Sequence, residues 1–484
     1  MKITKLILKD FKCFEWFEIN FAKEQNVHVI IAENMVGKSA IMNGLSLALN
    51  TYTMGVQSEK HQLGVSDHRV IGSNPIADIA SEVSIEATAL VEKNLDQVVE
   101  CHWLKYKTKP HGERTKIQIL NGLDPRIIAK ENLKLATVGK AINPLLGFIG
   151  TEYIHVQSSE TGTWEVNGKS IDGYRGCFDD KSIQKFLFKW LGKIDTIIGD
   201  TTRKPILAET YKDIPENAMS VFQMAVTSIL PDIEVIEWNA DAKEPFVKLK
   251  NGEIRSFKML SDGYKYLVLL AGEFATRAFI LNKHLGKNVL NKIRGIILID
   301  EFGIHLHPSL QNDALIRLQN TFPNVQFIIT THSPLLLNGL KKEQIHIIDI
   351  DKKTGKRFSS HPEEDIVGMG ANDILTQVFG LETTMDKEFI QWNDEYTYLF
   401  DKKKNNSLNE KEESRFKELS TLLAPLRLDP SLSLTQEDPI TRIVKEKLSE
   451  KSNQPIKSGL KVQTESFEKQ VDDILGDIFK DSSL

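Results

Sequence analysis

The sequence predicts an α/β protein in which helices flank a parallel sheet, and two stretches of the chain carry this prediction. Residues 27–31 form a short, continuous apolar run, and a helical pattern follows from Lys38. From residue 260 onward, buried-strand patterns and helical patterns alternate. Continuous apolar runs of this length are typical of strands that are buried on both faces of a parallel sheet. Alternation of such strands with helices is typical of the α/β class.

The 484-residue chain has the composition of an ordinary globular protein. Hydrophobic residues make up 41% and charged residues 26%, which excludes wholesale disorder, collagen and a coiled-coil rod. The length corresponds to roughly three average domains. Because the net charge is -5, any contact with nucleic acid has to be made by a local basic patch.

Cysteine usage and hydropathy predict a cytoplasmic protein without a membrane partner. The three cysteines, Cys13, Cys101 and Cys177, are odd in number and widely spaced, which fits a reducing compartment without a disulfide framework. The longest apolar runs are far shorter than the ~20 residues of a membrane span. The N-terminal stretch MKITKLILKDFK carries charges inside its apolar part, unlike a signal peptide.

The first half of the chain predicts strands, loops and helices in turn. Residues 3–8 alternate apolar and polar side chains, as a half-buried strand does. Residues 51–80 carry Gly, Ser, Asn and Pro at intervals and predict loops. The patterns that follow are strand-like over residues 82–91, 98–107 and 115–120, and helical near residues 126–140, 181–194 and 216–230.

The second half predicts the remaining elements and the division of the chain. Helices are expected at 262–282 and 309–320, strands at 295–299, 325–329 and 345–350, two helices joined by a polar turn within 386–427, linkers at 428–437 and 451–463, and an amphipathic helix at 464–480. We divide the chain into the N-terminal part of the α/β unit (1–80), inserted strands with a helical lobe (81–255), the C-terminal part of the α/β unit (256–350), a helical hairpin (351–437) and C-terminal interaction helices (438–484).

The strongest functional feature is the segment AENMVGKSA, which follows the buried strand and opens the helix. A loop in this place presents backbone amides and a helix N-terminus, which bind phosphate anions. In such a P-loop, Lys38 is expected to reach the β- and γ-phosphates, and the Ser39 hydroxyl to coordinate Mg²⁺. The residues expected to contact the nucleotide are Ala32, Glu33, Asn34, Met35, Val36, Gly37, Lys38, Ser39 and Ala40.

This loop departs from the usual P-loop motif at two positions. Ala32 stands where the motif has its first glycine, and Met35 occupies a position that is often glycine. If either position requires a positive φ angle, a side chain there strains the loop. We therefore expect nucleotide binding with slow hydrolysis.

Two further segments place polar groups at the ends of buried strands. The apolar run 296–299 ends in Asp300 and Glu301, which can hold Mg²⁺ and orient or deprotonate a water for attack on a γ-phosphate. The run 327–329 leads to His332, at the edge where open α/β sheets bind ligands. A buried strand with a polar edge and a structural histidine are the respective alternatives.

Three other segments allow more than one interpretation. The segment LSDGYK at 260–265 predicts a helix N-terminus with Ser261 as its cap. His305 and His307 are a weak metal pair without a third ligand nearby, so we assign them to the loop after Glu301. Residues 102–118 are basic with interleaved aromatics: Trp103, Tyr106 and the neighbouring lysines either bind nucleic acid or belong to a solvated hairpin with lysines on its edge.

Taken in order, the P-loop and the segments LSDG, LIDE and TTHS resemble the ABC-type ATPases of the SMC, RecF and OLD group. Specific motifs carry the resemblance over residues 1–50 and 255–350, and it extends more loosely over 140–255. It implies an ABC-type P-loop ATPase head with a mixed or parallel sheet, an inserted β-meander plus a helical region, and a C-terminal helical extension.

The resemblance also implies roles for single residues. ATP with Mg²⁺ would lie head-to-tail between two copies of the chain, with Glu301 as the catalytic base and Asp300 and Ser39 on the metal. His332 would sense the γ-phosphate, which Ser261 and Gly263 of the second copy would contact. The loop 303–308 would lie across the dimer seam, and a glutamine-bearing loop is expected at Gln157 or within 151–153.

Segments from the middle of the chain narrow the resemblance. NPLLGFIGTEYIHVQ, DGYRGCFDDKSIQKFLFKWL and GMGANDILTQVFG resemble the ATPase subunit of Septu-type anti-phage systems and of retrons that use a similar subunit. This implies an ATPase in antiviral defence that forms a homo-oligomer, has a separately encoded HNH-type nuclease as its partner, and acts with it on DNA. Because no acidic nuclease motif follows residue 350, we expect no nuclease activity in the chain itself.

Two other functions stay open at this point. The altered P-loop could bind nucleotide without hydrolysing it, which would make the protein a nucleotide-locked scaffold. A DNA-repair ATPase of RecF type would instead show turnover that DNA stimulates. A transporter ATPase is not expected, because the long insert between the P-loop and the LSDG segment does not resemble a short helical subdomain.

Overall fold

The computed structural model describes residues 1–427 except 58–60, 75–77, 152, 154–163, 167, 180–183, 382 and 406. Within the chain, two compact units are distinguished, Met1–Phe379 and Gly380–Leu484. The predicted linkers and the predicted C-terminal helix at 464–480 lie outside the described residues. Within the described ranges, no helix is both long and apolar enough to cross a bilayer.

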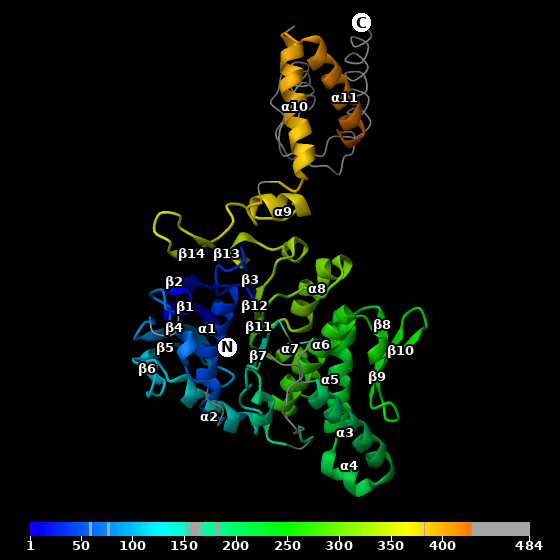
Figure 1. Cartoon of the computed structure of the whole chain (residues 1–484). Helices are drawn as coiled ribbons and strands as arrows, with labels where there is room; N and C mark the ends of the chain where they lie inside the picture. The colour runs from blue at the N-terminus through cyan, green and yellow to red at the C-terminus, as the bar shows by residue number, and fades with distance from the viewer. Residues whose placement is uncertain are drawn as a thin grey trace. The chain divides into compact units, whose positions relative to one another are not determined.

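A six-stranded mixed sheet forms the centre of the first unit, in the order β14-β13-β3-β12-β11-β7 (Figure 1). Its strands are β3 (Val27–Ala32), β7 (Leu145–Ile149), β11 (Gly295–Ile299), β12 (Val325–Thr330), β13 (Ile345–Ile350) and β14 (Arg357–Ser360). Five of them run parallel, and β14 pairs antiparallel with β13. The predicted parallel α/β sheet is therefore confirmed, and the carboxyl ends of β3, β11 and β12 share one edge.

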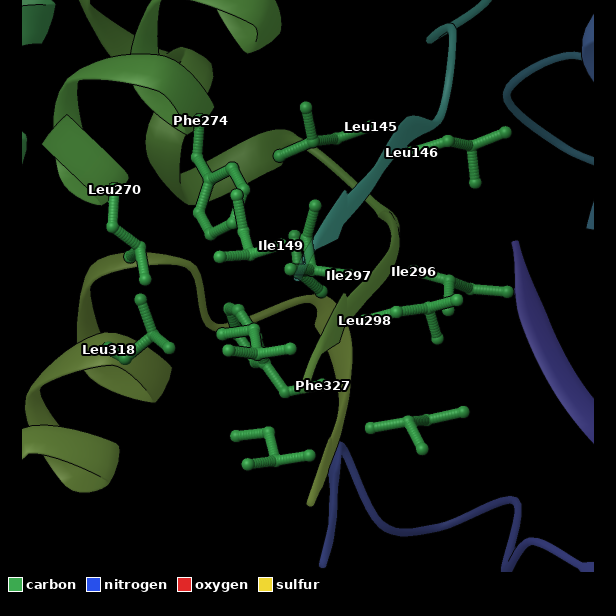
Figure 2. Packing of buried hydrophobic residues seen from close by; sticks show 14 of the residues in the cluster. Leu145, Leu146, Ile149, Leu270, Phe274, Ile296, Ile297, Leu298, Leu318 and Phe327 are labelled. Atoms are coloured by element: carbon green, nitrogen blue, oxygen red, sulfur yellow. The ribbon is translucent and has the colours of Figure 1, made fainter. Parts of the chain in front are cut away.

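The strands predicted at 27–31, 295–299 and 325–329 are confirmed as β3, β11 and β12. Every residue of these three strands is buried. Helices α6 (Asp262–Leu281) and α8 (Pro308–Thr321) contribute the side chains that cover one face. Figure 2 shows Leu270 and Phe274 of α6 and Leu318 of α8 directed toward Ile297 and Phe327 of the sheet. Burial on both faces explains why these strands appear in the sequence as mainly apolar runs.

A second, five-stranded antiparallel sheet has the order β2-β1-β4-β5-β6. It consists of β1 (Lys2–Phe11), β2 (Phe14–Asn20), β4 (Val83–Glu92), β5 (Val98–Lys107) and β6 (Lys116–Gly122). The three predicted strands after residue 80 thus form a meander that extends the N-terminal hairpin, since β4 pairs directly with β1. Helix α1 (Lys38–Thr53) contacts strands of both sheets, and this explains why it is buried on nearly all sides.

Helices and a small sheet complete the first unit. They are α2 (Pro125–Ala136), α3 (Gln184–Arg203), α4 (Pro205–Tyr211), α5 (Ile214–Ile229), α7 (Val289–Lys292), α9 (Ala371–Gln377) and the sheet of β8 (Ile233–Asn239), β9 (Glu244–Leu249) and β10 (Ile254–Ser256). The predicted helices near 126–140, 181–194 and 216–230 correspond to α2, α3 and α5. The long helix α6 packs against α5, so that its first turn is held on a fixed scaffold (Figure 1).

The second unit contains the predicted helical hairpin, α10 (Lys387–Lys404) and α11 (Glu410–Arg427). Asp386 caps α10 by accepting a hydrogen bond from the Phe389 amide at 2.8 Å. A small core of its own holds the two helices together and consists of Phe389, Tyr396, Leu399, Phe416, Leu419 and Leu423.

The side chains of the basic segment 102–118 divide between the core and the surface. Trp103 and Lys105 have 0% exposure, and Lys107 is also buried. The Lys105 ammonium donates to the Leu47 carbonyl of α1 at 2.9 Å, and burial lowers the pKa of this side chain to about 7. The stacking interpretation is therefore wrong for Trp103, and so is the idea of solvated edge lysines for Lys105 and Lys107, because alternate residues of β5 face the core.

A buried histidine pair predicts an acid-sensitive fold. Nδ1 of His28 on β3 lies 3.2 Å from Nε2 of His346 on β13. Burial lowers the pKa of His28 to about 4 and lowers the pKa of His346 well below its ordinary value. The unfolded chain then binds more protons than the folded chain between pH 6.5 and about 4, so stability is lost as the pH falls through this window. Chemical unfolding across this window is expected to show a shallower pH dependence in His28→Asn, whereas the exposed control His111→Asn should match the wild type. Parallel curves for all three proteins would contradict this assignment.

Candidate nucleotide site

The loop between β3 and α1 has the strand–loop–helix setting that a P-loop requires. Lys38 is the first residue of α1 and is 8% exposed. Its ammonium folds back across the loop and donates to the carbonyl oxygens of Ala32 at 2.8 Å and Glu33 at 3.0 Å. The loop therefore already surrounds one cationic group, which is placed at the N-terminus of a helix where anions are favoured.

Only one of the two unusual loop positions carries backbone strain. Met35 has a φ of 66° and a side chain that is 96% exposed, whereas Ala32 is the last residue of strand β3. The concern about a side chain at positive φ is thus confirmed for Met35 and wrong for Ala32, because the strand continues one residue further than a glycine turn would allow. Gly37, with a φ of 123°, occupies a conformation that favours glycine.

The strain at Met35 predicts a stabilising substitution. A left-handed conformation costs a non-glycine residue about 1–2 kcal/mol of stability. Glycine avoids this cost, but fixing its more flexible backbone on folding costs about 0.5–1 kcal/mol of entropy. We expect Met35→Gly to raise the free energy of unfolding by up to about 1 kcal/mol in urea titrations, because the exposed side chain contributes little burial. The matched change Asn34→Gly, at an exposed neighbour, should lower it. A loss of equal size in both variants would argue against strain at Met35.

A threonine from the neighbouring strand binds both residues that follow β11, through the Asp300 carboxylate and the Glu301 backbone amide. Asp300 is 6% exposed, and its carboxylate accepts a hydrogen bond from the Thr330 hydroxyl. The same hydroxyl oxygen accepts from the Glu301 amide at 2.7 Å. Glu301 has a φ of 54°, an unfavourable conformation for a non-glycine residue that hydrogen bonding on this loop maintains.

Electrostatic interactions show that four of the predicted site residues lie near one another. Burial lowers the pKa of Lys38, and the carboxylates of Glu301 and Asp300 oppose this shift. Burial and the nearby Lys38 ammonium lower the pKa of His332, again against Glu301 and Asp300. The structure thus brings together groups from the ends of β3, β11 and β12. A lowered pKa keeps the His332 imidazole neutral at pH 7, so that it can either donate or accept a hydrogen bond.

A cavity of about 300 Å³ opens beside these groups. Its lining includes Glu301, Gly303, Gln311, His332 and Ser333. The Gln311 amide nitrogen donates to the carbonyls of Gly303 at 2.9 Å and Leu306 at 3.0 Å, and its oxygen accepts from the Ser333 hydroxyl at 2.7 Å. One side chain of α8 therefore ties the loop after Glu301 to the loop that bears His332. Sequence reasoning missed both Gln311 and Thr330, since no local pattern distinguishes them.

Ser261 and Gly263 lie beside a different cavity of about 380 Å³, together with Asp232, Asp262, Tyr264, His305, His307, Ser309 and Leu310. Ser261 occupies the N-cap position of α6, but its exposed side chain makes no capping hydrogen bond. At Gly263 a Cβ atom would lie 2.8 Å from the His305 carbonyl oxygen, so only glycine fits this approach. Neither residue lines the cavity at Glu301, and within one chain the signature segment is thus not part of that pocket.

The remaining predicted positions have separate outcomes. Gln157 lies outside the described residues. Tyr153 is buried and donates its hydroxyl hydrogen to Glu273, whereas Thr151 is exposed beyond the end of β7. His307 caps α8 through its side chain, which accepts from the Ser309 amide at 3.3 Å. Among the residues that the structure describes, no group of three or more His, Cys, Asp or Glu side chains could hold a metal ion.

The residues at the P-loop fit Mg²⁺ as a nucleotide-borne ion. Mg²⁺ prefers hard oxygen ligands and is usually held by one or two protein groups together with substrate phosphates. The buried Asp300 carboxylate and the exposed Ser39 hydroxyl, at the second position of α1, supply oxygen ligands of this kind. Mg²⁺ would supply charge neutralisation on the phosphate oxygens.

Comparison with known proteins adds an independent line of information. A family model described as "AAA domain" matches residues 5–196, and one described as "AAA domain, putative AbiEii toxin, Type IV TA system" matches residues 207–338. The chain is 26% identical to the retron Vc95 probable ATPase of Vibrio cholerae serotype O1 biovar El Tor, over 78% of each protein. It is 22% identical to the retron Ec83 probable ATPase of Escherichia coli, over 85% of this chain and 81% of the relative.

Two further similarities cover other ranges. The Septu protein PtuA of Bacillus mycoides is 30% identical over 41% of this chain and 27% of its own length. The crystal structure of an Smc head bound to the C-terminal winged-helix domain of ScpA is 16% identical, covers 75% of this chain and 98% of its own, and has a TM-score of 0.45. The fold assignment rests on the strand order and motifs of the chain itself. This chain is similar to two probable ATPases of retrons and to a Septu protein, two AAA-domain models match residues 5–196 and 207–338, and its mixed α/β sheet carries the P-loop setting that its motifs predicted.

Proposed function

We propose that this protein binds ATP with Mg²⁺, hydrolyses it slowly between two copies of the chain, and acts in an anti-phage defence system. The observation that carries the proposal is the convergence of Lys38, Asp300, Glu301 and His332 at one edge of the central sheet. The similarity to ATPases of retrons and to a Septu protein supports the biological setting.

Each group has a role in the proposed reaction. The Lys38 ammonium leaves its loop carbonyls and binds the β- and γ-phosphates, and the Ser39 hydroxyl and the Asp300 carboxylate would hold Mg²⁺. The Glu301 carboxylate orients a water and accepts its proton as the water oxygen bonds the γ-phosphorus and the bond to the β,γ-bridging oxygen breaks, so that ADP and phosphate leave. The neutral His332 imidazole hydrogen-bonds the γ-phosphate and thereby senses whether it is present.

A second copy of the chain would complete the site. Ser261 is exposed at the start of α6 and lines a cavity apart from Glu301, which supports a contact with ATP bound to another copy. In the Glu301→Gln variant, ATP should therefore convert the protein into a dimer or a higher oligomer in sedimentation velocity. Ser261→Arg in that background should prevent this conversion while leaving ATP binding intact. Assembly that is insensitive to ATP, or unaffected by arginine at this position, would contradict the proposed arrangement.

The strained Met35 and the internal bonds of Lys38 favour slow turnover, and they keep a scaffold function as the second candidate. The two candidates separate in one experiment that measures ATP binding and phosphate release on the same sample. Binding that disappears in Lys38→Met, with release above background, selects the ATPase. ATP binding by the wild type, together with phosphate release no higher than that of Lys38→Met, selects the scaffold. A wild-type protein that binds no ATP would remove both.

We further propose that the nucleotide state controls a separately encoded HNH-type nuclease that acts on DNA, and that the C-terminal segment 438–484, for which the sequence predicts interaction helices, docks this partner. The test is co-purification of the nuclease with the full chain and with a chain that lacks 452–484. Loss of recovery after the deletion is expected, and unchanged recovery would exclude docking through this segment. DNA-stimulated turnover without any nuclease partner would instead favour the RecF-like alternative.

A further inference from the structure

Arg357 connects the last strand of the central sheet to the P-loop. It is the first residue of β14, at the edge of the sheet, and its side chain is half-buried. Its Nε donates to the Val36 carbonyl at 2.8 Å, and its Nη1 donates to the Cys13 carbonyl at 2.6 Å. The guanidinium also lies 5.8 Å from the ring centroid of Phe14. One side chain thus holds both the P-loop and the turn between β1 and β2.

The bond to Val36 fixes the orientation of the peptide that precedes Gly37. A trans peptide is planar, so its carbonyl oxygen and the following amide hydrogen point in opposite directions. While Arg357 holds the Val36 oxygen, the Gly37 N–H has to point to the other side of the loop. Hydrogen bonds to a charged guanidinium are stronger than those between neutral groups, which makes this orientation hard to reverse.

The same peptide has little room to move in other directions. A Cβ atom on Gly37 would lie 2.7 Å from Phe14 Cζ and 2.8 Å from Cys13 Sγ, so the β1–β2 turn packs directly against this glycine. Because Arg357 also holds the Cys13 carbonyl, it fastens the loop and the surface on which the loop rests. Lysine could not replace it, since an ammonium lacks the planar fork that reaches two carbonyls in fixed directions.

We propose that Arg357 is a positioning residue for nucleotide binding: through the Val36–Gly37 peptide it directs the Gly37 amide toward the β-phosphate. The proposal rests on the proposed ATP site and deepens it, because it places a determinant of that site on a strand beyond the four ATPase motifs. A group that acts on the β-phosphate affects ADP and ATP alike, whereas a group that acts on the γ-phosphate affects ATP alone.

The test is calorimetric titration of the full-length protein and of Arg357→Ala with ADP and with ATP. We expect Arg357→Ala to bind both nucleotides roughly tenfold more weakly, which corresponds to about 1.4 kcal/mol. Guanidinium chloride at low millimolar concentration should restore part of the affinity by occupying the vacated site, and Arg357→Lys should show an intermediate loss. Rescue by guanidinium distinguishes positioning by this group from a general loss of structure.

Arg69→Ala is the matched control, since this half-buried arginine bonds Asp10 on β1 at 2.9 Å, next to the same turn. It should bind ADP as the wild type does. Equal losses in Arg69→Ala and Arg357→Ala, or a loss that guanidinium does not reduce, would overturn the proposal. If Arg357→Ala does not fold, the nucleotide affinity of Arg357→Lys is the test. Wild-type affinity in Arg357→Lys would also overturn the proposal. An absence of nucleotide binding by the wild type would overturn the proposed function itself, a result that is distinct from these.

Discussion

Replacing Glu301 with glutamine is expected to lower ATP turnover by about a hundredfold or more while ATP binding is retained. General bases contribute on the order of 10²–10⁴ to the rate, and glutamine keeps the shape of the side chain without accepting a proton. The backbone of residue 301 should keep its conformation, because the hydrogen bond that its backbone amide donates to the Thr330 hydroxyl does not involve the side chain. Phosphate release and equilibrium ATP binding, measured on the same preparation, give the two quantities.

The control for this prediction is Glu343→Gln, an exposed carboxylate outside the cavity at Glu301. It should turn over ATP at the wild-type rate. Equal, nonzero rates in the wild type and in Glu301→Gln would remove Glu301 from the mechanism. A loss of ATP binding in Glu301→Gln would show that this carboxylate supports the bound state rather than the attacking water.

The second large effect concerns stability and is expected for Arg277→Met. Arg277 on α6 has 0% exposure, and its guanidinium donates to Glu273 at 2.8 Å and to the carbonyls of Gly173 at 2.9 Å and Arg175 at 2.7 Å. Glu273 also accepts from the hydroxyl of buried Tyr153. Methionine has a similar apolar stem, but it leaves the Glu273 carboxylate buried without its cation. Such a change costs about 3–5 kcal/mol, measurable as a lower urea midpoint.

Two variants control this prediction. Arg317→Met removes an i, i+4 ion pair with Asp313 on the more exposed surface of α8 (3.0 Å) and should change stability by less than about 1 kcal/mol. Glu273→Gln combined with Arg277→Met should recover part of the loss, because no buried charge then lacks a partner. If Arg277→Met and Arg317→Met lost the same stability, the buried pair would not be the cause.

Local patterns were sufficient to predict most elements of the α/β unit. Strands β3, β11, β12 and β13 were predicted because burial within the sheet makes these segments mainly apolar. The hairpin of α10 and α11 was predicted because the chain between them is polar and short. By contrast, the edge strand β7 was missed because its pairing partner β11 lies far away in the sequence, and the edge strand β14 was missed because four residues are too few to show a strand pattern.

The same difference separates the predicted site residues from those that were missed. Lys38, Asp300, Glu301 and His332 were predicted because each directly follows a buried strand or its loop, a position that the sequence displays. Gln311, Thr330 and Arg357 were missed because they act through hydrogen bonds to residues on other elements. Trp103, Lys105 and Lys107 were misread as surface residues because the basic composition of a segment does not show which of its side chains face the core.

The sequence by itself determined the class of fold and the chemistry of the site, because periodicity and motif order are local properties of the chain. Only the tertiary structure decided how that chemistry is held. Thr330 binds the Asp300 carboxylate and the Glu301 backbone amide, Gln311 joins the loops after Glu301 and around His332, and Arg357 fastens the loop before Lys38. Each of these contacts joins residues that only folding brings within hydrogen-bond distance, so no pattern along the chain can reveal them.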